Sequence, residues 1–295
     1  MTLKEGALAT YVTSDAHGHV RALDRALEMA RPGTQDTVFV LGDMVDRGPD
    51  PLGVITLVRS LPNVHVLMGN HEAMLLETIL KGNQLDMMSW HMNGGFVTSE
   101  QLDALPRERY AELMDWLAAL PTFAVVETDD ARPTAAPGAR RMHVLCHAGI
   151  DAPRLRASLA QAGVGRMAGV ATRTPRRRTC WGRWFPQQVE DLLWIRHEFW
   201  SNPTGLVGLD GRGPVVGRPH PVDPAGSLCA PHVRDGRGRE PARRDGGGWS
   251  DARHGRVADR ICIDCSAAAG YPSGRVGVMR LEDRRVWYAD INEGE

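Results

Sequence analysis

The fold is decided by one stretch, TVFVLGDMVDRGPDPLGVITLVRSLPNVHVLMGNHE, residues 37–72. It contains two short apolar runs, 37–42 and 64–69, each typical of a buried strand. Between them, 51–61 has a helical pattern that begins with proline, a residue suited to the first turn of a helix. The stretch therefore predicts a strand, a helix and a second strand that runs parallel to the first.

The same rhythm continues on both sides of this stretch. Residues 8–14 are a further strand candidate, 19–30 place apolar residues on one helical face, and 71–80 and 107–120 continue as helices. Strand-like runs follow at 122–128 and 141–147, and at 260–267, 274–282 and 286–291, which we expect to be closing antiparallel strands. The sequence thus predicts an α/β fold, in which sites gather beyond the carboxyl ends of parallel strands.

Polar residues follow the predicted strands at the points where the strands end. They are Asp15 and His17 after the first strand, Asp43, Asp46 and Arg47 after the second, Asn70 and His71 after the third, and His147 after a later one. Carboxylate and imidazole groups together suit borderline divalent metals such as Mn, Fe or Zn. One such motif could be an ordinary turn, but four in order predict a metal site.

The motifs resemble those of a known family. They are D-x-H-G from Asp15, G-D-x-x-D-R-G from Gly42, G-N-H-E from Gly69 and H-A-G from His147. In this order they resemble the calcineurin-like metallophosphoesterases, and within them the phosphoprotein phosphatase branch with its bacterial and phage-lambda-type serine/threonine phosphatases. The W-x-x-N-G-G stretch 90–95 and LLWIR at 192–196 add to the resemblance. It implies a metallophosphoesterase β-sandwich flanked by helices.

The resemblance also implies a centre with two divalent metal ions, Mn²⁺ in the first place and Fe or Zn as alternatives. Asp15 and His17 would bind one ion, Asn70 and His147 the other, and Asp43 would bridge both. A hydroxide shared by the two ions would attack the phosphorus atom.

The remaining residues of the motifs would act on the substrate. His71 would protonate the leaving oxygen as a general acid, with Asp46 orienting its ring. Arg47 and Arg196 would each offer a planar guanidinium to the phosphate. Glu72 would tune the site or cap the helix that starts beside it.

One motif of the family is missing. A further metal-binding histidine belongs to a G-H-T-P motif, and this chain has PVVGRPHP at 214–221 instead. His220 is the best substitute, because it follows a short Val-Val strand, and His232 is the runner-up. Codons for Gly-His-Thr-Pro read in another frame give Arg-Pro-His-Pro, so 218–258 could be frame-shifted sequence, which resequencing the gene would test.

Length and composition bound the organisation of the chain. With 295 residues we expect a single domain, 1–295, with an insertion at 152–190 and a poorly ordered or irregular low-complexity segment at 208–258. A net charge of −1 gives no reason to expect a nucleic-acid partner, and no apolar stretch suits a membrane. Five scattered cysteines fit a reducing compartment, so we expect a cytoplasmic protein.

Three functions are compatible with these residues. The leading prediction is hydrolysis of phosphomonoesters by a serine/threonine protein phosphatase, with a phosphorylated protein or a small phosphoester as the substrate. The alternative is a symmetrical bis(5'-nucleosyl)-tetraphosphatase, which would hydrolyse diadenosine tetraphosphate with the same dimetal motifs. The glutamate after Asn70-His71 and the W-x-x-N-G-G stretch favour the phosphatase. A third possibility is an inactive binding protein that keeps the fold.

Overall fold

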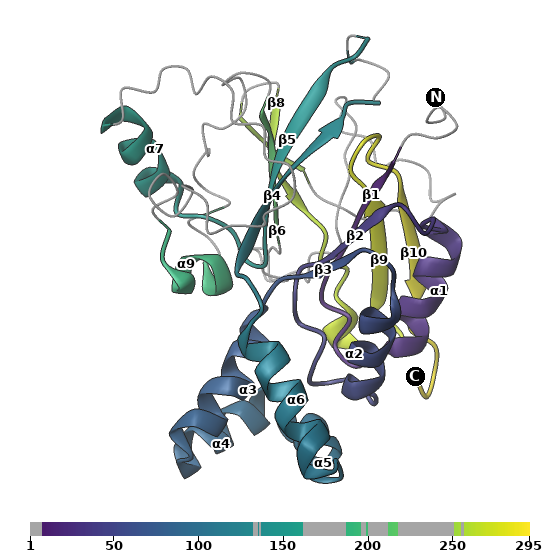
Figure 1. Cartoon of the computed structure of the whole chain (residues 1–295), viewed down its shortest axis with the longest axis vertical. Helices are drawn as coiled ribbons and strands as arrows, with labels where there is room; N and C mark the ends of the chain where they lie inside the picture. The colour runs from purple at the N-terminus through teal and green to yellow at the C-terminus, as the bar shows by residue number, and fades with distance from the viewer. Residues whose placement is uncertain are drawn as a thin grey trace.

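The architecture is a β-sandwich with helices outside both sheets, seen in a computed structural model (Figure 1). The structure describes residues 8–131, 135, 137–161, 187–195, 199, 212–217, 251–254 and 257–295. Within these residues, two five-stranded sheets are formed. The expected β-sandwich flanked by helices is confirmed.

The first sheet contains the strands on which the sequence prediction rested. In spatial order they are β10 (Val286–Asp290), β9 (Arg275–Arg280), β1 (Thr10–Thr13), β2 (Thr37–Val40) and β3 (Val64–Val66). The strands β1, β2 and β3 run parallel, and β9 is antiparallel to both β1 and β10. The parallel core and the antiparallel closing pair β9–β10 both agree with the prediction.

The second sheet is built from the later part of the chain. In spatial order its strands are β4 (Phe123–Asp129), β5 (Arg140–Cys146), β6 (Arg212–Gly217), β8 (Val257–Cys262) and β7 (Asp251–His254). The strand β5 is antiparallel to β4 but parallel to β6, and β6 is parallel to β8. The expectation of an antiparallel strand at 260–267 was therefore wrong for its pairing with β6, because apolar patterning does not encode the direction of a neighbouring strand.

Helices cover the outer faces of the sheets. The described helices are α1 (Val20–Ala30), α2 (Pro51–Ser60), α3 (Asn70–Lys81), α4 (Gln84–Trp90), the π-helical turn η1 (His91–Gly95), α5 (Phe96–Asp103), α6 (Arg107–Ala118), α7 (Ala152–Gln161), α9 (Val189–Trp194) and the 3-10 turn η2 (Ala267–Ala269). As predicted, α2 begins with a proline, and the Asp50 side chain caps it by accepting a hydrogen bond from the Gly53 N–H at 2.9 Å.

Three apolar clusters hold the layers together. The cluster between the two sheets includes Val12, Leu41 and Leu67 from the first sheet side and Leu145 and Ile261 from the second, all almost fully buried. A larger cluster joins the first sheet to α1, α2 and α6, and a smaller one joins β5 to α7 and α9. Burial on both faces of each sheet fixes the strand ends relative to one another.

Several sequence-based expectations fall on residues outside this description. The single domain is not tested, nor is the insertion at 152–190, of which 162–186 lie outside the described residues. Most of 208–258 also lies outside them, apart from β6, β7 and the start of β8, so the frame-shift hypothesis stays a prediction. None of the helices in the described part of the chain combines the length and apolar character needed to cross a bilayer. The cytoplasmic location stays a prediction.

Candidate metal centre

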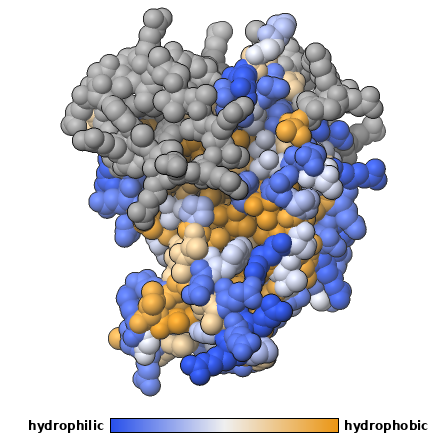
Figure 2. All heavy atoms as spheres, viewed as in Figure 1, coloured by the Kyte–Doolittle hydropathy of each residue, from blue (hydrophilic) through white to orange (hydrophobic). Residues whose placement is uncertain are grey.

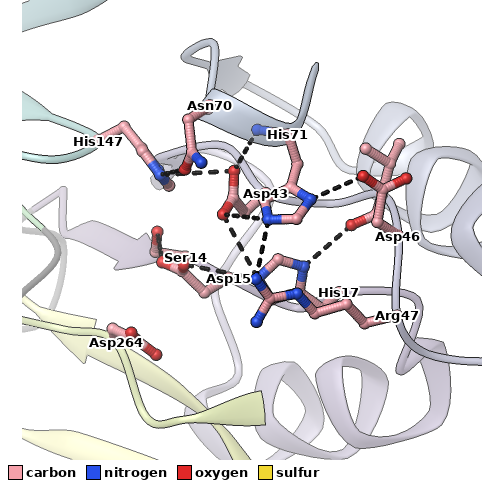
Figure 3. Close-up of polar contacts among 12 residues, drawn as sticks. Ser14, Asp15, His17, Asp43, Asp46, Arg47, Asn70, His71, His147 and Asp264 are labelled. Atoms are coloured by element: carbon pink, nitrogen blue, oxygen red, sulfur yellow. Dashed lines mark hydrogen bonds and ion pairs between the residues drawn. The ribbon is translucent and has the colours of Figure 1, made fainter. Parts of the chain in front are cut away.

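The polar residues that follow the strands meet at one buried place at the strand ends (Figure 3). The loops after β1 and β2 and the start of α3 bring residues from the first sheet, and His147 follows β5 of the second sheet. The side chains gathered there are Asp15, His17, Asp43, Asp46, Asn70, His71 and His147, each 3% exposed or less. Buried carboxylates and imidazoles are costly to desolvate, so their clustering needs compensating partners.

The backbone at this place adopts a left-handed conformation that ordinary residues rarely take. Positive φ angles of 42° to 71° occur at Asp15, His17, Asp43, Asp46 and Arg47. Each costs about 1 kcal/mol or more. Backbone hydrogen bonds between the two loops hold the conformation, for example from the His17 N–H to the Asp43 carbonyl at 2.9 Å. Such concentrated strain is typical of functional sites.

Asp43 is the centre of the cluster, because its two oxygens face different histidines. The His17 Nε2 atom lies 3.4 Å from Asp43 Oδ2, and the His147 Nε2 atom lies 3.4 Å from Asp43 Oδ1. Two triads of possible ligands share this carboxylate: Asp43 with His17 and His71, and Asp43 with Asp15 and His147, with the ligand atoms of each triad within 4.8 Å of one another. The donor set therefore fits two divalent cations bridged by one carboxylate.

Backbone carbonyls fix the orientation of two of these imidazoles. His147 Nδ1 lies 2.7 Å from the Leu41 carbonyl, and His17 Nδ1 lies 3.0 Å from the Val45 carbonyl. A carbonyl only accepts, so each Nδ1 carries the proton and donates it. The Nε2 atoms face the Asp43 cluster, where that of His147 also lies 2.7 Å from Asn70 Oδ1, and an Nδ1 held by a carbonyl is the arrangement found in metal-ligating histidines.

Glu72 organises the loop that carries Asp43. Its carboxylate accepts hydrogen bonds from the N–H groups of Asp43 and Met44, both at 2.8 Å, and from that of Gly69, the N-cap of α3, at 2.9 Å. Burial and the nearby charge of Asp43 raise the pKa of Glu72 to about 7. The expected capping role of Glu72 is thus observed, together with contacts that shape the site.

Asp46 is held from three sides. Its Oδ2 accepts from Trp90 Nε1 at 2.9 Å and lies 2.7 Å from His71 Nδ1, while its Oδ1 accepts from the Thr98 hydroxyl at 2.7 Å. The Thr98 oxygen in turn accepts from the Asp46 N–H at 2.9 Å. Thr98 was not recognised from the sequence, although it lies just beyond the W-x-x-N-G-G stretch.

Arg47 lies at the open side of the cluster. Its backbone N–H donates to the Gly94 carbonyl at 2.9 Å, and its Nη2 lies 3.2 Å from His71 Nε2. Gly94 has a φ of +100°, and a Cβ there would come within 2.6 Å of the Arg47 Cγ. The glycine is therefore required by both its conformation and this close approach.

Two predicted site residues are not described by the structure, and one further residue lies near the cluster. Arg196 and His220 lie outside the described residues. Figure 3 shows Asp264, which sequence reasoning missed, on the Asp15 side of the cluster. It follows β8, is 7% exposed, and its Oδ1 accepts from the Ser266 N–H at 2.7 Å. In the sequence, Asp264 lies inside the strand-like run 260–267, so its position after a strand end became visible only when β8 was found to end at Cys262.

The β-sandwich and its buried carboxylate and imidazole cluster define this protein as a metallophosphoesterase. Residues 8–219 match the calcineurin-like phosphoesterase family, and the chain belongs to that family of hydrolases.

Its relatives include proteins named symmetrical bis(5'-nucleosyl)-tetraphosphatase. The one from Erwinia tasmaniensis is 30% identical over 250 residues, which cover 77% of this chain and 80% of that protein. A shorter match is found with the one from Pectobacterium atrosepticum, which is 33% identical over 41% of this chain and 40% of that protein. The one from Proteus mirabilis is 40% identical over 25% of this chain and 28% of that protein. The last two matches thus span less than half of each relative.

Solved structures share the fold at low sequence identity. A crystal structure of a protein suggested to be a diadenosine tetraphosphatase has a TM-score of 0.52 and 18% identity, covering 100% of this chain and 98% of that one. A protein serine/threonine phosphatase from Saccharomyces cerevisiae has a TM-score of 0.54 and 13% identity, covering 99% and 82%. These likenesses support the fold alone.

Proposed function

We propose that this hydrolase splits symmetrical dinucleoside tetraphosphates into two nucleoside diphosphates. The observation that carries the proposal is the match to the Erwinia tasmaniensis tetraphosphatase, which extends over most of both chains. The buried cluster around Asp43 supports it, because cleavage of a highly charged phosphate chain benefits from bound cations.

The proposal reverses the order of the functions expected from the sequence. The leading prediction was a serine/threonine protein phosphatase acting on a phosphorylated protein, and the tetraphosphatase was its alternative. The relatives at 30% to 40% identity bear the tetraphosphatase name, whereas the likeness to a serine/threonine phosphatase is at 13% identity. An inactive binding protein is the least supported, since family and relatives alike are hydrolases.

We assign the metal ligands as the sequence suggested. Asp15 and His17 would hold one ion, Asn70 and His147 the other, and Asp43 would bridge them; Mn²⁺ is the first choice, with Fe or Zn as alternatives. When bound, the two ions would supply charge neutralisation of the phosphate oxygens and activation of the attacking water.

The side chains around the cluster would handle the substrate. His71 would pass a proton from Nε2 to the oxygen that leaves with one nucleoside diphosphate, while Asp46 holds Nδ1 at 2.7 Å. The exposed guanidinium of Arg47 lies beside that Nε2 and would bind a phosphate oxygen there. We propose Arg196 as a second phosphate-binding group.

The missing ligand is a separate proposal. His220 would replace the histidine of the absent G-H-T-P motif on the second ion. His220→Ala should then lower the metal content per chain, measured by plasma mass spectrometry. An unchanged metal content would remove His220 from the site.

Product analysis tests the function. Protein loaded with Mn²⁺ is given diadenosine tetraphosphate, a phosphopeptide and p-nitrophenyl phosphate, and the nucleotides are separated by chromatography. We expect adenosine diphosphate as the only nucleotide product and a higher kcat/KM for the dinucleotide than for the phosphopeptide. Formation of adenosine triphosphate with adenosine monophosphate, or a preference for the phosphopeptide, would contradict the proposal.

A further inference from the structure

An exposed apolar surface lies next to the candidate centre. It runs along α4, η1 and the start of α5, and we call it the α4–α5 surface: Leu85 is 78% exposed, Met88 60%, Met92 86% and Phe96 56%. Figure 2 shows apolar side chains gathered in the lower left, where Figure 1 places α4. Single exposed apolar residues are ordinary, but a group of large ones marks a binding surface.

Helical spacing places three residues of the α4–α5 surface on one face. Leu85, Met88 and Met92 are spaced by three and four residues, the spacing of one helical face. Trp90 is the one buried residue of α4, so this short helix presents most of its surface to solvent. Met92 and Phe96 are the two members nearest in sequence to Asn93 and Gly94.

The α4–α5 surface is continuous with the centre through η1. The Asn93 carbonyl accepts from Arg47 Nε at 3.4 Å, and the Gly94 carbonyl accepts from the Arg47 N–H at 2.9 Å. Met92 directly precedes Asn93 in the chain. Met92 is therefore the exposed apolar residue of this segment that is nearest in sequence to the Arg47 contacts.

Aromatic contacts orient Phe96, the second of these two residues. The Phe96 ring packs edge-on against the His91 ring at 5.6 Å between centroids, and His91 lies 5.4 Å from the Trp90 ring. Trp90 is itself fixed by its hydrogen bond to Asp46. Phe96 is thus supported by a row of rings that begins at the centre, yet its side chain stays more than half exposed.

We propose that Met92 and Phe96 bind a nucleobase of the dinucleoside tetraphosphate, an inference that rests on the proposed function. Among the described residues, those gathered around Asp43 offer charged and polar groups to the phosphate chain, whereas the bases need apolar contacts. Each half of the substrate carries a ribose and a flat base beyond its two phosphates. Flat bases stack well on aromatic rings and on polarisable methionine sulfur. The α4–α5 surface adjoins Arg47 through η1, where one such arm would leave the centre.

The test compares two substrates in the same protein preparations. Met92→Ala, Phe96→Ala and the double variant are assayed on diadenosine tetraphosphate and on p-nitrophenyl phosphate, which has no base. We expect the ratio of the two kcat/KM values to fall about tenfold in the double variant, mainly through a higher KM for the dinucleotide. Leu80→Ala is the matched control, because Leu80 is 84% exposed and lies on α3. Its ratio should stay at the wild-type value.

The outcomes separate the inference from the function on which it rests. If wild-type protein cleaves the dinucleotide and the double variant keeps the wild-type ratio, the base-binding role is wrong while the function stands. If wild-type protein hydrolyses only p-nitrophenyl phosphate, both are wrong. If the double variant instead changes the molar mass seen by light scattering while Leu80→Ala leaves it unchanged, the surface is a contact between two copies of the chain, which also overturns the inference.

Discussion

Removing the Thr98 hydroxyl should slow the enzyme only when the leaving group needs a proton. In Thr98→Val the shape of the side chain is kept, but the 2.7 Å hydrogen bond to Asp46 Oδ1 and the 2.9 Å hydrogen bond from the Asp46 N–H are both lost. Thr98 is fully buried, so water cannot replace the hydroxyl. Asp46 then loses one of the groups that hold it against His71, the proposed proton donor.

The size of the effect follows from the contacts that remain. A hydrogen bond to a charged group contributes about 1.5–3 kcal/mol, and general acid catalysis accelerates reactions roughly 10²- to 10⁴-fold. Asp46 keeps its contacts with Trp90 and His71, so only part of that acceleration should be lost. We expect kcat to fall about tenfold, which corresponds to about 1.4 kcal/mol in the barrier.

Two closely similar substrates provide the assay. Phenyl phosphate expels a strongly basic phenoxide oxygen, which takes up a proton as it leaves, whereas p-nitrophenyl phosphate expels a phenoxide that its nitro group stabilises as an anion. Thr98→Val should lower kcat about tenfold for phenyl phosphate and about twofold or less for p-nitrophenyl phosphate, because only the first leaving group depends on general acid catalysis. Thr98→Ser keeps the hydroxyl and should restore most of the phenyl phosphate rate. Equal losses on both substrates, or a serine variant as slow as the valine variant, would refute the reasoning.

Three further predictions test the centre and its surroundings. Asp43→Asn should lose most of both metal ions, measured by plasma mass spectrometry, because this carboxylate is proposed to bridge them. The control Asp24→Asn, at an exposed position, should keep both ions. Full metal content in Asp43→Asn would show that Asp43 does not bridge the ions. Gly94→Ala should lower kcat/KM about tenfold, since a Cβ would clash with Arg47. In the control Gly82→Ala the Cβ meets nothing within 4 Å, so kcat/KM should stay unchanged and only about 1 kcal/mol of stability should be lost. Similar kinetics for both variants would contradict the strain argument. Burial raises the pKa of Glu282 to about 7 from 4.5, so its contribution to stability is present below about pH 4.5 and is lost as the pH rises through 7. Glu282→Gln should therefore flatten the pH dependence of urea unfolding in this window, by up to about 3 kcal/mol, and an unchanged slope would exclude this group as its source.

The part of the site that sequence could predict lies on parallel strands close together in the chain. Asp15, Asp43 and Asn70 each follow one of the three parallel strands of the first sheet, and parallel strands end at a common edge. Alternating strands and helices were enough to predict that edge. The structure brings these residues together, and their metal-binding roles follow as proposals.

The part that sequence could not predict depends on contacts between distant segments. Thr98 meets Asp46 across 52 residues, through a short helix and a π-helical turn whose apolar residues are mostly exposed. No periodic pattern marks such a segment, because periodicity reports burial against a core. The same holds for Asp264, which reaches the neighbourhood of Asp15 only because β8 joins the second sheet beside β6.

The topology of the second sheet also bears on the missing ligand. The strands β5, β6 and β8 are parallel neighbours, with Leu145 paired with Val216 and Gly217 paired with Cys262, so all three end at nearly the same level. His147 follows the first of them, and Asp264 follows the third. The middle strand ends at Gly217, at the edge that carries the centre. His220 lies three residues after this strand in sequence and His232 fifteen, so we keep His220 as the proposed ligand of the second ion.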